Sequence, residues 1–209
     1  MLNAHGVVPP EITSGVLKFA QEVSPGHRPK YVPVIPVPRG RPADCFNNVR
    51  LQIESGGGEM QCGWAIWLIP QIMIEAEHHA VWVGPDGRVV DVSPYARSLT
   101  KTLFLPDPRQ TDLGKPIDNI RRPISNDPLV DEFIARSRRK YELLYETHAD
   151  VPFGREVRLT PDEYDEVFPD APAFDRAFMS LVVSKRRAQD PCICGSARQF
   201  RRCCGKGTR

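Results

Sequence analysis

The sequence predicts an α+β fold, in which helices pack on an antiparallel sheet, followed by a small cysteine-rich module at the C-terminus. Amphipathic stretches with helical spacing lie on both sides of a segment rich in tryptophan, isoleucine and valine, Met60 to Ser93. This segment contains the turn Gly84-Pro85-Asp86-Gly87, which is typical of a hairpin. Four of the six cysteines fall between residues 192 and 204, outside the predicted core.

The first part of the chain is expected to contain two helices and an extended segment. Apolar residues recur at helical spacing from Glu11 to Glu22, and Ser24-Pro25-Gly26 ends this pattern. Lys30 to Pro38 alternates valine, isoleucine and proline, which permits an edge strand because proline cannot donate to a ladder. A second helix is predicted to begin at Asp44, whose carboxylate can cap it, and to end at Gly56-Gly57-Gly58.

Three strands and a long loop are predicted next. The strands are Met60 to Leu68, Ile72 to Val83 and Arg88 to Ser93, and the last two form the hairpin. The prolines and polar residues from Ser93 to Asn126 predict a loop.

Helices are predicted for the remainder of the body. Asp127-Pro128 begins a helix that runs to about Thr147, and Thr160-Pro161-Asp162-Glu163 is a capping-box start for a short one. A last helix runs from Pro172 to about Arg187. We therefore expect a body of residues 1–187 and a tethered module of residues 188–209.

The C-terminal module has the spacing of a zinc knuckle. Cys192 and Cys194 can direct two thiolates to one point from an extended turn, and Cys203 and Cys204 close the other side. Four sulfur ligands in a closed tetrahedron favour structural Zn²⁺ and leave no position for a catalytic water. So short a module cannot bury enough apolar surface to fold alone, so metal binding and folding should be one event.

This C-x-C-x8-C-C pattern, with Gly195-Ser196 after the second cysteine, resembles the SEC-C motif found at the C-terminus of the preprotein translocase ATPase. The resemblance covers about residues 190–207. The same cysteines could instead form two disulfides in a secreted chain. Because Met1 to Pro9 shows no basic segment followed by a long apolar one, we expect a reducing, cytoplasmic location.

Charge is distributed unevenly along the chain. Lys185 to Arg209 contains eight Lys or Arg residues and one acidic residue, Asp190, whereas the preceding residues carry a net negative charge. Such a basic module could dock on a protein, ribosome or nucleic-acid surface, or remain a solvated module without a fixed partner. No membrane span is predicted, because the longest apolar stretch, Trp64 to Ile74, is far shorter than the roughly 20 residues a bilayer requires.

Residues 42–95 contain a candidate catalytic triad. Cys45 lies at a predicted helix start, where the helix dipole and free N–H groups favour a thiolate. His79 lies on a strand and Asp91 on the strand paired with it. In this arrangement His79 would exchange protons with the substrate and Asp91 would fix its tautomer.

The strand pair resembles the histidine and aspartate strands of transglutaminase-like proteins within the papain-like class. The resemblance rests on His79-Ala80-Val81-Trp82-Val83, a turn, and Val90-Asp91-Val92-Ser93-Pro94. It implies a cysteine-dependent hydrolase or acyltransferase that acts on a peptide or amide-like bond. That family usually has Gly-x-Cys at the nucleophile, whereas this chain has Pro42-Ala43-Asp44-Cys45.

Each candidate also has a structural interpretation. Cys45 could be a small buried hydrophobic residue, His79 a core histidine, and Asp91 a cap near the following turn. Cys62 is expected to pack in the core.

Glu75, Glu77, His78 and His79 could suggest a metal site as well. Alternation along a strand, however, places His78 on the opposite face from the other three. We therefore expect a polar face on which Glu75 or Glu77 influences His79.

Two functional hypotheses follow. In the first, the body is a thiol hydrolase or acyltransferase, and the zinc knuckle brings it to a partner. In the second, the chain is a non-enzymatic adaptor, whose body binds a protein or peptide while the basic knuckle docks on an acidic surface.

Overall fold

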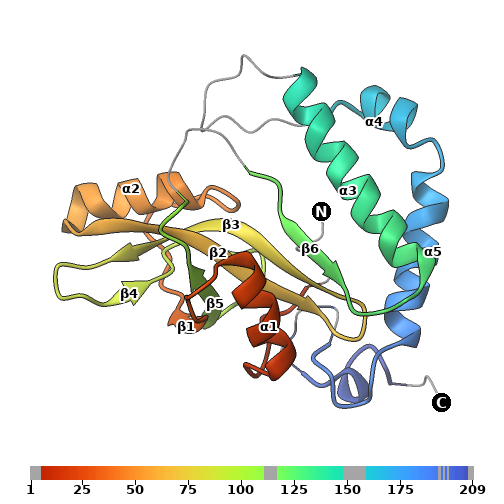
Figure 1. Ribbon diagram of the computed structural model, residues 1–209, viewed down its shortest axis with the longest axis horizontal. Helices are drawn as coiled ribbons and strands as arrows, with labels where there is room; N and C mark the ends of the chain where they lie inside the picture. Colours follow the sequence, from red (N-terminus) through yellow and green to blue (C-terminus); the bar gives the residue numbers. More distant parts are fainter. Residues whose placement is uncertain are drawn as a thin grey trace.

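The chain is described here from a computed structural model, which covers residues 6–110, 117–147, 159–192, 194, 196 and 198–206 (Figure 1). The elements are, in chain order, α1 (Ser14–Val23), β1 (Lys30–Pro33), α2 (Cys45–Gly56), β2 (Glu59–Ile69), β3 (Met73–Val83), β4 (Val89–Val90), β5 (Lys101–Pro106), β6 (Ile120–Pro123), α3 (Pro128–Thr147), α4 (Pro161–Val167), α5 (Ala171–Ser184) and the 3-10 helix η2 (Phe200–Arg202). The predicted α+β class, an antiparallel sheet with packed helices, is confirmed.

One sheet organises the body, with the strand order β1-β5-β2-β3-β4 and with β6 paired to the far end of β3. β2 and β3 form a long antiparallel hairpin in which Cys62 lies opposite Ala80 and Trp64 opposite His78. The two outer edges of the sheet also meet, because Val34, just after β1, forms a parallel bridge with Asp91, just after β4. The sheet is therefore curled, and this contact is called the seam below.

Helices α1 and α2 cover the same face of the sheet, the outer face of the curl. α1 buries Val16, Phe19, Ala20 and Val23, an i, i+3, i+4, i+7 stripe, against β2, β3 and β5. α2 packs through Phe46 and Val49 on a cluster that also contains Ala80, Val90 and Val92. This packing places the N-terminus of α2, and with it Cys45, near β3.

Helices α3 and α5 come together beside the turn between β2 and β3 (Figure 1). Ile69, Ile72 and Met73 pack there against α3 and α5. Arg136 of α3 also binds the carboxylate of Asp170, at 2.6 and 2.9 Å, immediately before α5. None of the helices in the described residues combines the length and the low polarity needed to cross a bilayer.

The predicted loop between Ser93 and Asn126 is wrong in part, because it contains β5 and β6. β5 is buried on both faces, with Leu103 and Leu105 in the core under α1 and Phe104 in a cluster on the opposite face. It therefore lacks the alternation of polar and apolar residues that marks a half-buried strand. β6 is only four residues long and contains the two arginines Arg121 and Arg122, so its composition resembles a loop.

Candidate active site and candidate metal centre

His79 and Asp91 form a buried pair on the inner face of the curled sheet. The Nε2 atom of His79 lies 3.0 Å from Oδ2 of Asp91, and both residues are buried, Asp91 completely. Burial raises the pKa of Asp91, but the charge of His79 and hydrogen bonds from its neighbours outweigh burial and lower it. The carboxylate is therefore ionised and fixes the orientation of the imidazole.

Asp91 accepts three further hydrogen bonds. Tyr95 Oη donates to Oδ2 at 2.6 Å, Thr102 Oγ1 on β5 donates to Oδ2 at 3.0 Å, and the Ser93 N–H donates to Oδ1 at 3.0 Å. The backbone of Asp91 is also part of the seam, because its N–H donates to Pro33 and its carbonyl accepts from Ile35, each at 2.9 Å. Both the side chain and the main chain of Asp91 are thus held in place.

Cys45 is a further polar neighbour of His79. Burial alone lowers the pKa of His79, but the charge of Asp91 and the Coulombic and hydrogen-bond interactions with Cys45 raise it well above 6.5. Because Nε2 faces Asp91, Nδ1 is the ring nitrogen left for the thiol. The structure thus brings together Cys45, His79 and Asp91, the three residues singled out in the sequence.

The predicted cap of α2 is wrong in one detail. Asp44 is the N-cap residue, but its carboxylate makes no capping hydrogen bond to the helix and accepts from the Asn47 amide at 2.7 Å. The Asp44 side chain therefore leaves the N-terminus of α2 uncapped, and the dipole of α2 points its positive end at this position. Ala43, two residues before Cys45, adopts a φ of 59°, which is uncommon for a residue with a side chain.

Sequence reasoning missed Tyr95 and Thr102. The Tyr95 hydroxyl lies 2.6 Å from Asp91 and 3.5 Å from His79 Nε2, and its ring packs edge-on against Trp67 at 5.8 Å. Burial and then the charge of Asp91 raise the pKa of Tyr95, so the phenol stays protonated and acts as a donor. No sequence pattern marks Tyr95, which follows the Ser93-Pro94 turn. Thr102 lies on β5, in a segment for which the sequence predicts a loop.

Glu75, Glu77 and His78 do not belong to a metal site. Glu75 forms an ion pair with Arg121, at 2.9 Å, and Glu77 accepts a hydrogen bond from the Trp67 indole at 2.6 Å. His78 points to the other face of β3, as predicted, where its ring contacts Phe46 and Trp64.

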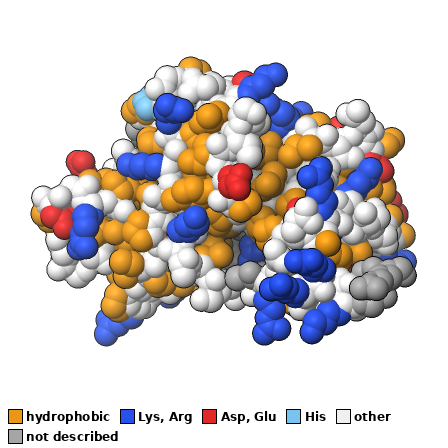
Figure 2. Space-filling view, turned by 90° about the horizontal axis from the view of Figure 1, so that it is seen from below, with side chains coloured by type: hydrophobic (Ala, Val, Ile, Leu, Met, Phe, Trp, Pro, Cys, Tyr) orange, Lys and Arg blue, Asp and Glu red, His pale blue; other side chains and the backbone are white. Residues whose placement is uncertain are grey.

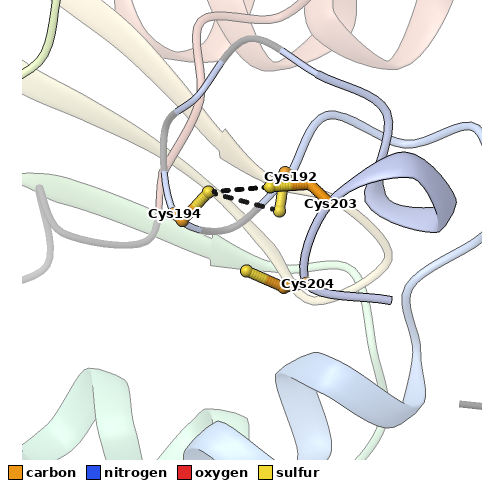
Figure 3. Close-up of side chains that lie close together, drawn as sticks. All are labelled: Cys192, Cys194, Cys203 and Cys204. Carbon is orange, nitrogen blue, oxygen red and sulfur yellow. Dashed lines mark hydrogen bonds between the residues drawn. The ribbon is translucent and has the colours of Figure 1, made fainter. Parts of the chain in front are cut away.

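The four C-terminal cysteines converge (Figure 3). Cys194 Sγ lies 3.4 Å from the sulfurs of both Cys192 and Cys203, and all four sulfurs lie within 4.8 Å of one another. Within the part of the chain that the structure describes, this is the one group of three or more potential ligands that could hold a metal ion. The six cysteines are free thiols, so the structure has no disulfides in the knuckle.

Local structure explains how the cysteines come together. The Cys192 N–H donates to the Arg198 carbonyl at 2.8 Å and closes a loop that contains Cys194. η2 then turns the chain back toward Cys192, and Phe200 is buried inside the module. Gly205 lies so close to the Phe200 ring that a Cβ atom there would be 2.8 Å from it, so glycine is required.

The donor set fits a tetrahedral zinc ion. Zn–S bonds of about 2.3 Å place the four sulfurs of a tetrahedron about 3.8 Å apart. Hydrogen bonds with Ser196, and then with Cys192 and Cys203, lower the pKa of Cys194 to about 6. Hydrogen bonds to Cys192 and Cys194 raise the pKa of Cys204 to about 12. The Cys204 thiol therefore retains a proton at neutral pH, which a divalent cation would displace.

Residues 190–206 match the family model of the SEC-C motif. The match covers the module with the four cysteines and leaves the body unmatched. No curated protein and no solved structure matches the chain. The resemblance of residues 42–95 to transglutaminase-like proteins therefore has no support from relatives, whereas the SEC-C assignment of the C-terminus is confirmed.

Hydrogen bonds join the SEC-C motif to the predicted linker and to Arg186 at the end of the body. The Ala188 and Asp190 carbonyls accept from Arg201 and Phe200, at 3.0 and 2.8 Å. Arg186, which is buried, donates to the Pro191 carbonyl at 2.9 Å. The linker is therefore part of the hydrogen-bond network of the motif.

Proposed function

We propose that this chain is a zinc-binding, cysteine-dependent hydrolase or acyltransferase that acts on a peptide or amide-like bond. In this proposal Cys45 is the nucleophile, His79 the general base and acid, and Asp91 the residue that orients His79. The observation that carries it is the buried His79–Asp91 pair with Cys45 interacting with His79. Three residues from separate elements meet with the chemical roles that thiol catalysis requires.

The first steps follow from this geometry. Asp91 holds the Nε2–H of His79, so Nδ1 can take the proton of the Cys45 thiol. The thiolate attacks the carbonyl carbon of the substrate, and the imidazolium returns the proton to the leaving nitrogen as the C–N bond breaks. A water or an acceptor nucleophile then gives its proton to His79 and cleaves the thioester.

The uncapped N-terminus of α2 supports this proposal. The tetrahedral intermediate carries a negative charge on oxygen, which backbone N–H groups can stabilise when they are aimed at it. The Asp44 carboxylate does not compete for the N–H groups of the first turn, because it is engaged by Asn47. The positive end of the helix dipole also favours the thiolate of Cys45.

The metal has a structural role in this proposal. Cys192, Cys194, Cys203 and Cys204 would hold Zn²⁺, which would order the SEC-C motif and leave no position for a substrate. These four cysteines lie outside the thiol site, so they take no part in the chemistry at Cys45.

The second candidate is a non-enzymatic adaptor, and the surface of the SEC-C motif supports it. Figure 2 shows Lys and Arg side chains gathered beside the C-terminal module. The exposed basic residues in the described part of this region are Lys185, Arg187, Arg198, Arg201, Arg202 and Lys206. Such a surface would attract an acidic protein, a ribosome or a nucleic acid, with an affinity that falls as salt is added.

The rate of iodoacetamide alkylation at Cys45, measured against pH on the zinc-loaded protein, tests the proposed enzyme. Wild type should remain reactive well below pH 8.5, where a model thiol loses its reactivity, because His79 stabilises the thiolate. His79→Ala should move the rate curve to higher pH. His78→Phe, which removes the neighbouring imidazole on the other face of β3, is the matched control and should leave the curve in place.

The outcome that contradicts the proposal is a Cys45 that behaves like a model thiol and does not respond to His79→Ala. That result would favour the adaptor, and salt-sensitive capture of an acidic partner by the SEC-C motif would then be the measurement to make.

A further inference from the structure

A second thiol lies close to the candidate active site. Cys62 on β2 and Cys45 on α2 pack against the same cluster of buried residues, which includes Val49 and Ala80. Cys62 is directly opposite Ala80 in the β2–β3 ladder, and Ala80 is the neighbour of His79 in sequence. The packing of α2 on the hairpin thus gathers both thiols on one side of β3.

The electrostatic environment of Cys62 is consistent with this proximity. Burial raises the pKa of Cys62, a negative charge on Cys45 raises it further, and Arg50 opposes both effects. The interaction between two such groups decreases with distance, so it is appreciable only for neighbours. Cys62 is therefore expected to stay a neutral thiol beside the reactive Cys45.

Cys62 has no part in the proposed reaction or in the SEC-C motif. It is half-buried, so it is neither sealed in the core nor freely exposed. A half-buried thiol next to a nucleophilic cysteine has the position of a resolving cysteine, which captures the oxidised form of its neighbour.

We propose that Cys62 is a resolving thiol, which joins peroxide-oxidised Cys45 in a reversible disulfide and so switches the thiol site off. This inference rests on the proposed function, because it requires a reactive Cys45. It gives the site a regulation by a two-electron oxidant of the peroxide class.

The chemistry involves two steps. The Cys45 thiolate attacks one oxygen of the peroxide, the O–O bond breaks, and Cys45 becomes a sulfenic acid while hydroxide leaves. The sulfur of Cys62 then attacks the Cys45 sulfur, the S–O bond breaks, and the oxygen leaves as water with the proton of the Cys62 thiol. Peroxide is reduced by two electrons in total and the two thiols are oxidised by the same number, which a dithiol reductant reverses.

The experiment uses the full-length, zinc-loaded protein treated with a small excess of hydrogen peroxide, followed by alkylation of the remaining thiols and tryptic digestion. Cleavage after Arg39, Arg50 and Arg88 places Cys45 in peptide 40–50 and Cys62 in peptide 51–88. Because Arg50 separates the two cysteines, a Cys45–Cys62 disulfide appears as two linked peptides that together are lighter by two hydrogens. Mass spectrometry thus distinguishes this disulfide from oxidation of the knuckle.

The variants Cys62→Ser and Cys62→Ala test the resolving step. Wild type should give the linked peptides and little sulfenic acid at Cys45, whereas both variants should give no linked peptide and several-fold more dimedone adduct at Cys45. Cys45→Ser should give neither. Two substitutions at Cys62 ensure that poor folding of one does not decide the result.

The inference is overturned if wild type and the Cys62 variants accumulate the same dimedone adduct at Cys45 and no linked peptide forms. A normal alkylation response of Cys45 to His79→Ala in the same preparation would leave the proposed function intact. Linked peptides from a Cys45 that alkylates at the rate of a model thiol would show only that the two sulfurs are neighbours, and would contradict both the proposed function and the switch that rests on it.

Discussion

His78 contains a buried imidazole whose removal should stabilise the protein. Its side chain is 8% exposed and lies between Phe46 and Trp64, with ring centroids at 4.9 and 5.5 Å. Within the described part of the chain neither ring nitrogen has a hydrogen-bond partner. A buried polar group without a partner costs about 1–3 kcal/mol, and phenylalanine at this position would remove that cost.

His78→Phe is therefore expected to raise the free energy of unfolding by about 1–2 kcal/mol at pH 7, after allowing for the larger ring between Phe46 and Trp64. His78→Asn is the matched control, because it keeps a buried polar group at the same position. It should bring no gain. Urea unfolding followed by tryptophan fluorescence measures all three proteins.

The gain should also depend on pH. Burial, and then the charge of His79, lower the pKa of His78, while Asp107 acts in the opposite direction. The unfolded chain therefore takes up a proton near pH 6.5 that the folded protein excludes, so wild type loses stability as the pH falls below about 6.5. The limiting slope for one proton is about 1.4 kcal/mol per pH unit.

His78→Phe does not bind this proton, so its advantage over wild type should widen from pH 7.5 to pH 5.5. His79, whose pKa is raised, is present in both proteins, and its charge affects the difference between them only by disfavouring the protonation of His78. A variant that is less stable than wild type at every pH, or an advantage that does not change with pH, would refute the reasoning.

Two further predictions concern the proposed active site and the metal centre. Tyr95→Phe removes the 2.6 Å donor to Asp91, so the pKa of Asp91 should rise. The acid limb of the Cys45 alkylation curve should then move to higher pH, with little change in rate at pH 7.5. An unchanged limb would mean that the phenol does not stabilise the carboxylate. Urea unfolding of this variant should show a loss of about 1.5–3 kcal/mol, the usual value for a hydrogen bond to a charged group. Cys203→Ser should release zinc, measured with a chromogenic chelator, and leave the thermal transition of the body nearly unchanged. The control is Ser196→Ala, which removes a hydroxyl 3.3 Å from the Cys203 sulfur and should retain zinc. Collapse of the whole protein on loss of zinc would contradict the view of the motif as a separate module.

The sequence predicted the elements that are long or periodic. α2 has one apolar face, which its periodicity locates, whereas β2 and β3 are buried on both faces and are marked by their length and by their tryptophan, isoleucine and valine residues. β5 could not be found in this way, because Thr102, Leu103, Phe104 and Leu105 are all buried. A strand covered on both faces differs little in pattern from any short apolar run.

Some residues of the candidate site could be predicted from the sequence, and others could not. Cys45, His79 and Asp91 could be selected because their residue types are reactive and the order of elements brings them together. Tyr95 and Thr102 could not, because a hydroxyl that donates to a buried carboxylate leaves no periodic mark in the sequence. The sequence also could not show that the Asp44 carboxylate binds Asn47 and does not cap α2, since the Asn47 amide is as good a donor to that carboxylate as the N–H groups of the helix.

Asp91 combines two functions that proteins usually separate. Its amide and carbonyl join β1 at the seam, with hydrogen bonds of 2.9 Å to Pro33 and Ile35, while its carboxylate holds His79 at 3.0 Å. A fluctuation that parts the two edges of the sheet therefore also displaces the carboxylate from the imidazole. In a native-state hydrogen-exchange experiment, the amide protons of Ile35 and Asp91 would report how often the seam opens and the Asp91 carboxylate moves away from His79. Substitutions in β1, remote from any substrate, would then act on activity through the lifetime of the closed sheet.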